Sequence, residues 1–176
     1  GKPDNLLVTG GASFATWDFR YPYDSGAEGT LLVCDFSTVQ LQSHQLKGAT
    51  RQYAPPEYLD AKGDIDWSAP VTKLGDVYSF LGATMWELAT GRTIPSDPRL
   101  RTPAVLMATN PRIPDAFARL VCQWASTDPQ DRVPGSQGPL ERKLHSRLLQ
   151  QIDTAWTEFC RTGDPDTLVL RRGDAL

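Results

Sequence analysis

The chain has 176 residues, of which 40% are hydrophobic, enough to bury one core, so a single domain is expected. The net charge of -3 and a pI near 5.3 give no basic surface of the kind that binds nucleic acid, and we expect no nucleic-acid partner. His44 and His145 lie far from any cysteine pattern, which argues against a zinc site. Three widely spaced cysteines, two of them in apolar segments, are typical of reduced, buried thiols in an intracellular protein, cytoplasmic or nuclear: Cys34, Cys122 and Cys160.

Two short β-favouring runs, at residues 6–8 and 30–34, each stand next to a polar cluster. Lys2-Pro3-Asp4-Asn5 precedes the first run and Asp35-Phe36-Ser37 follows the second. If the runs form neighbouring strands, the two clusters converge in one cleft. The connection, residues 10–29, is longer than the roughly 2–5 residues usual for a hairpin. It is rich in aromatic side chains, as expected for either a protein-docking surface or a loop that folds back over the domain: Phe14, Trp17, Phe19, Tyr21 and Tyr23.

The chain after the segment Gly48 to Glu57 has a region with helical periodicity. Between Lys73 and Gly91 an apolar stripe with α-helical spacing predicts a buried helix that ends at the glycine: Val77, Phe80, Leu81, Met85 and Leu88. This segment is too short for a membrane span and carries Glu87, so we expect no membrane contact.

Two further helices are predicted near the carboxyl end. Pro114-Asp115 opens a helix with Phe117, Leu120, Val121 and Trp124 on one face, and Asp128-Pro129-Gln130-Asp131-Arg132 follows it. A long amphipathic helix is predicted from Pro139 to Cys160, before Gly163, with one apolar side: Leu140, Leu144, Leu148, Ile152, Trp156 and Phe159.

The order of K-P-D-N, D-F-S, P-P-E and D-P-x-x-R resembles the protein kinase family, serine/threonine type, from the catalytic loop onward. The resemblance implies an α+β, mostly α-helical fold: the large lobe of a kinase with a small β-hairpin and without the amino-terminal lobe. Residues 1–162 would form this partial kinase domain, and residues 163–176 a tail.

The implied activity is ATP-dependent phosphoryl transfer to Ser or Thr hydroxyls of a protein substrate. Asn5 and Asp35 would hold Mg²⁺, since hard oxygen ligands suit this ion. With Lys2, which would contact the γ-phosphate, they would also bind the co-substrate ATP. Thr50 would help to fix the catalytic loop, and Glu57 would form a structural ion pair with Arg132.

The sequence also departs from the kinase pattern. The catalytic base would precede residue 1, so we expect a fragment that is inactive in isolation. Ser37 replaces the usual glycine and restricts the backbone there. The alternative is therefore a pseudokinase or scaffold that binds partners through residues 10–29. The retention of Lys2, Asn5, Asp35 and Thr50 favours the enzyme.

Overall fold

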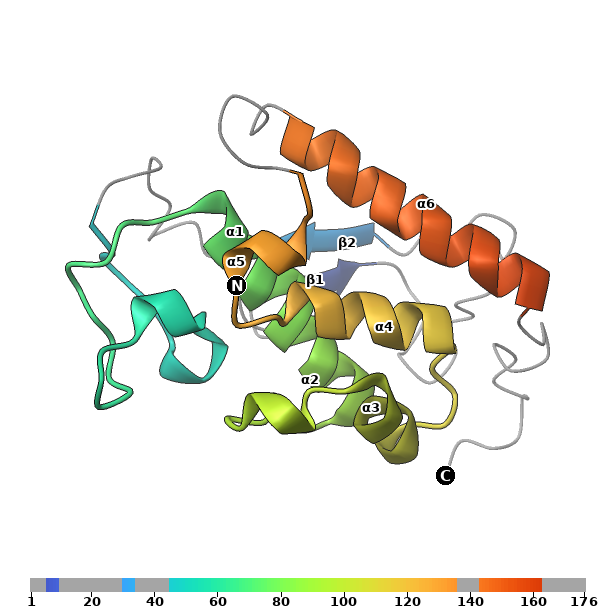
Figure 1. Cartoon of the computed structure of the whole chain (residues 1–176), viewed down its shortest axis with the longest axis horizontal. Helices are drawn as coiled ribbons and strands as arrows, with labels where there is room; N and C mark the ends of the chain where they lie inside the picture. The colour runs from blue at the N-terminus through green and yellow to red at the C-terminus, as the bar shows by residue number, and fades with distance from the viewer. Residues whose placement is uncertain (1–5, 10–29, 34–44, 136–142, 163–176) are drawn as a thin grey trace.

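The computed structural model describes residues 6–9, 30–33, 45–135 and 143–162, and the described chain is mostly helical (Figure 1). Strands β1 (Leu6–Thr9) and β2 (Thr30–Val33) pair antiparallel, with Leu6 opposite Val33 and Thr9 opposite Thr30. Both predicted strands and their pairing are thus confirmed. The aromatic-rich residues 10–29 lie outside the described residues.

An extended segment with two 3₁₀ turns, η3 (Arg51–Tyr53) and η4 (Pro56–Tyr58), precedes the main helices (Figure 1). Pro56 stands at the first position of η4, where a missing N–H costs no hydrogen bond. Tyr53 and Tyr58 are both buried. Because both turns anchor a tyrosine in the core, the segment is held against the helices although it contains little regular structure.

The central helix consists of three consecutive pieces: α1 (Lys73–Asp76), the π-helix η5 (Val77–Thr84) and α2 (Met85–Thr90). Thr72 caps its start by accepting a hydrogen bond from the Gly75 N–H at 2.9 Å. Gly91 ends it in the left-handed conformation at φ 67°, which confirms the predicted stop.

The predicted buried face of this helix is wrong in its second half. Met85 is 37% exposed and Leu88 53% exposed, whereas Trp86 is buried. The prediction assumed 3.6 residues per turn throughout, but the wider turns of η5 rotate the following residues away from that face. The residues that face the core in η5 include small ones, Gly82 and Ala83, which allow the helix to approach its neighbour closely.

Four further elements continue the chain: η6 (Pro98–Leu100), α3 (Pro103–Thr109), α4 (Asp115–Trp124) and the short α5 (Pro129–Arg132). Leu120, Val121 and Trp124 of α4 are buried and Phe117 is partly buried, which confirms this predicted helix and its apolar face.

The last helix, α6 (Leu144–Thr162), lies along α4 (Figure 1). Its buried side includes Leu144, Ala155 and Phe159, whereas Ile152 is 40% and Trp156 49% exposed, contrary to the prediction. Residues four apart in an α-helix are offset by about 40° around its axis. A long i, i+4 row therefore winds around the helix and does not stay on the side that contacts a neighbouring straight helix. Residues 139–142, including Leu140, lie outside the described residues.

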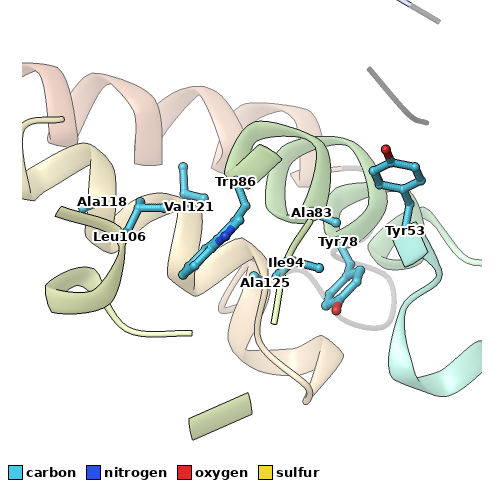
Figure 2. Close-up of a cluster of buried hydrophobic side chains, with 9 residues drawn as sticks. All are labelled: Tyr53, Tyr78, Ala83, Trp86, Ile94, Leu106, Ala118, Val121 and Ala125. Atoms are coloured by element: carbon cyan, nitrogen blue, oxygen red, sulfur yellow. The ribbon is translucent and has the colours of Figure 1, made fainter. Parts of the chain in front are cut away.

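The main apolar cluster joins the central helix to α3 and α4 around Trp86 and Leu106 (Figure 2). A second cluster joins α4, α6 and Val77, and a third holds the segment before α1 through Tyr58. Among the described residues no helix is long and apolar enough to cross a membrane.

Cys122 and Cys160 are free thiols; Cys160 is exposed, while Cys122 is partly buried against the main cluster. Burial raises the pKa of the Cys122 thiol to about 11. At pH 8 about one thiol in a thousand is then ionised, against roughly a quarter for an unperturbed thiol. We therefore expect iodoacetamide to alkylate native Cys122 at least ~100-fold more slowly than the unfolded chain, as measured by mass spectrometry. Equal rates in the two states would contradict this.

Candidate functional site

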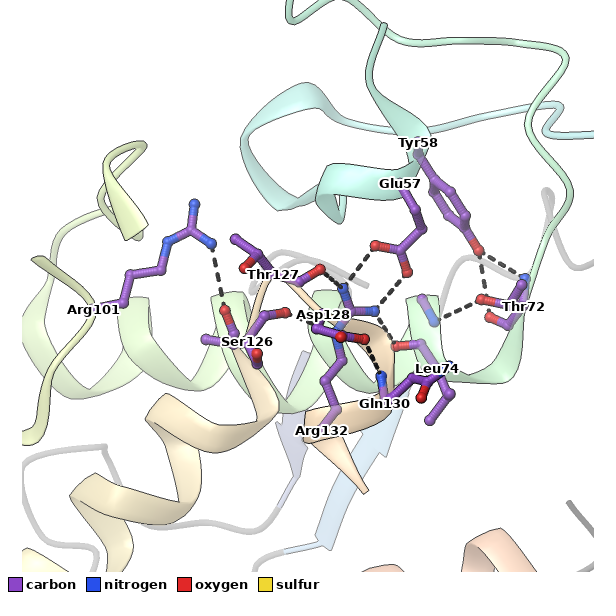
Figure 3. Close-up of polar contacts among 12 residues, drawn as sticks. Glu57, Tyr58, Thr72, Leu74, Arg101, Ser126, Thr127, Asp128, Gln130 and Arg132 are labelled. Atoms are coloured by element: carbon purple, nitrogen blue, oxygen red, sulfur yellow. Dashed lines mark hydrogen bonds and ion pairs between the residues drawn. The ribbon is translucent and has the colours of Figure 1, made fainter. Parts of the chain in front are cut away.

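Arg132 and Glu57, 75 positions apart, form the ion pair that the sequence predicts (Figure 3). The guanidinium donates Nη1–H to Oε1 at 2.6 Å and Nη2–H to Oε2 at 2.7 Å, a bidentate geometry. Arg132 is fully buried and the Glu57 side chain is 24% exposed. The pair fastens the segment that contains η4 to α5.

The remaining hydrogens of Arg132 are also bound. Nε donates to the Ser126 carbonyl at 2.9 Å, Nη1 to the Leu74 carbonyl at 2.8 Å and Nη2 to the Thr127 carbonyl at 3.4 Å. The guanidinium also lies 4.9 Å from the centre of the Tyr78 ring. All five N–H donors of a buried cation therefore have acceptors, which is the condition for burying it without a large cost.

Two tyrosines fix the same segment at other points, and the sequence analysis missed both contacts. The Tyr53 hydroxyl donates to Oε2 of Glu87 on α2 at 2.7 Å. The Tyr58 oxygen accepts from the Thr72 N–H at 2.8 Å, and burial raises the pKa of this phenol. A buried tyrosine hydroxyl needs a partner, so a contact was expected in principle. Which polar group supplies it depends on tertiary packing.

The segment held in this way has a buried side and an open side. Tyr53, Ala54 and Pro55 are buried, whereas Thr50, Arg51 and Gln52 are exposed. Thr50 immediately precedes η3, and its carbonyl accepts the Tyr53 N–H at 2.9 Å, while its side chain makes no capping bond to the turn. The open side therefore presents the Thr50 hydroxyl, the Gln52 amide and the Arg51 guanidinium, which lies 3.5 Å from an exposed Asp64 carboxylate.

The other predicted site residues, Lys2, Asn5 and Asp35, lie outside the described residues, so their roles stay predictions. Asn5 is adjacent in sequence to Leu6 and Asp35 is two residues beyond Val33, and these two strand residues pair with each other. Within residues 45–135 and 143–162, no group of three His, Cys, Asp or Glu side chains is arranged to hold a metal ion.

No protein-family model, no curated protein and no solved structure matches this chain.

Proposed function

We propose that this chain is the large-lobe part of a serine/threonine protein kinase that transfers a phosphoryl group from Mg-ATP to protein hydroxyls. The observation that carries the proposal is the buried Glu57–Arg132 pair. It joins the P-P-E and D-P-x-x-R motifs, whose pairing the kinase resemblance implies. Chance motif matches would have no reason to meet in a bidentate, fully hydrogen-bonded contact.

The geometry of the fastened segment also supports this proposal. Phosphoryl transfer depends chiefly on positioning and on charge stabilisation, because the protein does little covalent chemistry itself. A backbone fixed through Tyr53, Glu57 and Tyr58, with Thr50 to Gln52 exposed, suits the docking of a peptide whose hydroxyl must be held still. In the proposed enzyme Asn5 and Asp35 bind Mg²⁺, Lys2 contacts the γ-phosphate of ATP, and Thr50 helps to fix the catalytic loop.

A second candidate is a pseudokinase or scaffold that uses the same lobe for protein binding. Ser37 favours it, because a side chain at that position restricts a turn where the family pattern has glycine. The two candidates differ in one measurable property, Mg²⁺-dependent transfer of phosphate.

The experiment expresses the gene product at full length and measures its transfer of radiolabelled phosphate from ATP to a Ser/Thr peptide mixture. We expect this transfer to require Mg²⁺ and to stop when EDTA removes the ion. Asp35→Ala should lower the rate at least about a hundredfold, since it removes a metal ligand that stabilises transferring charge.

Asp153→Ala is the matched control, because it removes an exposed aspartate on α6 and should leave the rate unchanged. Full activity of Asp35→Ala would contradict the assigned metal site. A full-length gene product that folds and binds partners but transfers no phosphate would support the pseudokinase instead.

A further inference from the structure

The π-helix η5 lies inside a helix that is otherwise continuous. The backbone is helical at both junctions, with φ -57° and ψ -47° at Val77, and φ -67° and ψ -34° at Met85. A turn closed by an i→i+5 hydrogen bond holds one residue more than the i→i+4 turn of an α-helix. The path from Lys73 to Thr90 therefore contains more residues than the same helix would need in α-helical form.

Core packing shows the same excess. Tyr78, Ala83 and Trp86 all belong to the main apolar cluster, although the first two are five positions apart. In an α-helix residues five apart point roughly 140° away from each other. The Thr84 hydroxyl donates to the Ser79 carbonyl, again five positions earlier, at 2.8 Å. The π turns thus place on one face of the helix residues that α-helical geometry would separate.

Both ends of this helix are attached to the segment that carries η3 and η4. At the amino-terminal end, the Leu74 carbonyl accepts a hydrogen bond from Arg132, which also holds Glu57 (Figure 3). At the carboxyl-terminal end, Glu87 accepts a hydrogen bond from Tyr53. Tyr53 and Glu57 are only four residues apart, so the rotation between the two ends of the helix is restricted.

The middle of the helix is restricted as well. A Cβ added at Gly82 would lie 3.0 Å from the Cα and the N of Ala125, both backbone atoms at the end of α4. A rotation that replaced Gly82 by a larger residue at this contact would push the two helices apart. The chain therefore cannot accommodate an extra residue by rotating the second half of the helix about its axis.

We propose that η5 absorbs one surplus residue, so that Glu87 and Leu74 stay in the register that an α-helix one residue shorter would give. In this role η5 keeps the segment from Thr50 to Tyr58 in position. The idea that this segment docks a substrate peptide rests on the proposed function. The assignment of the helix register does not depend on it.

Deletion of Phe80 tests the register directly. Phe80 is partly exposed and belongs to none of the three apolar clusters of the described residues. One comparison variant is Phe80→Ala, which removes the side chain without changing the number of residues in the helix. The other is insertion of one alanine after Phe80, which adds a second surplus residue. The readouts are the urea midpoint and the coupling between Tyr53→Phe and Glu87→Gln in a double-mutant cycle in each background.

We expect the deletion variant to unfold at a urea midpoint no lower than that of Phe80→Ala, and to keep the Tyr53–Glu87 coupling. The insertion should lower the midpoint and abolish the coupling. A deletion variant that is unfolded, or less stable than Phe80→Ala, or without the coupling, overturns the proposal. So does an insertion tolerated as well as the deletion. Neither readout needs ATP or peptide, so failure of the kinase assay leaves this result unaffected.

Discussion

Arg132→Ala is expected to lower the free energy of unfolding by about 3–5 kcal/mol, the range for removing one partner of a buried ion pair. Arg132 has no exposed side-chain surface, and its loss removes one donor from each of three carbonyls and both donors from the Glu57 carboxylate. Glu57 retains 24% exposure, so water solvates part of the freed charge. The loss therefore belongs toward the lower end of this range. Urea denaturation monitored by tryptophan fluorescence measures it.

Arg99→Ala is the matched control for this substitution. Arg99 also binds a carboxylate with two nitrogens, donating from Nε and Nη2 to Asp97, but its side chain is 89% exposed. Water and salt screen such a pair, so we expect almost no change in stability. Similar losses for the two variants would show that burial is not what gives the Glu57–Arg132 pair its strength.

Gly75→Ala is expected to destabilise the fold by about 2–3 kcal/mol, the upper part of the range for overpacking. A Cβ at this position would lie 2.2 Å from Oη and 2.6 Å from Cζ of the buried Tyr58 ring. The ring cannot move freely, because its oxygen is bound to the Thr72 N–H. Alanine favours a helix over glycine by only about 1 kcal/mol, which is too little to offset the clash. Thermal and urea unfolding both measure the effect.

A second substitution tests whether the clash with Tyr58 is the cause. Tyr58→Phe removes Oη, the closest atom, so the double variant with Gly75→Ala should lose less stability than the sum of the two single variants. Gly91→Ala serves as control, since nothing lies within 4 Å of its added Cβ and only the strain of φ +67° remains, about 1 kcal/mol. A fully additive double variant would rule out the Oη contact as the source.

Local patterns predicted much of this fold correctly. The strands around Leu6 and Val33 and the helix from Asp115 were predictable because each depends on the side chains of its own neighbourhood. The stop at Gly91 follows from the one residue type that adopts positive φ without strain. The Glu57–Arg132 contact spans 75 positions, and only the resemblance to kinase motifs indicated it.

The candidate site also has a part that the sequence indicated and a part that it did not. Motif order selected Thr50 and Glu57 within the described residues, and Lys2, Asn5 and Asp35 outside them. It did not indicate that Tyr53 binds Glu87 or that Tyr58 binds Thr72. Such partners are chosen by how separate elements pack, and many acidic or carbonyl groups along the chain would satisfy a tyrosine equally well.

By itself the sequence determined the bounds of several elements, such as the start of α4 and the stop at Gly91, because caps, prolines, glycines and apolar runs act over a few residues. It did not indicate α3 or the π turns of η5. Only the tertiary structure decided which helix faces became buried. Met85 and Leu88 are exposed because the π turns of η5 rotate the helix after Thr84, and Trp156 is exposed because α6 follows α4 along a different line from its i, i+4 row. Helical periodicity assumes one constant rotation per residue, whereas contacts at Arg132, Glu87 and Gly82 set the rotation that this chain adopts.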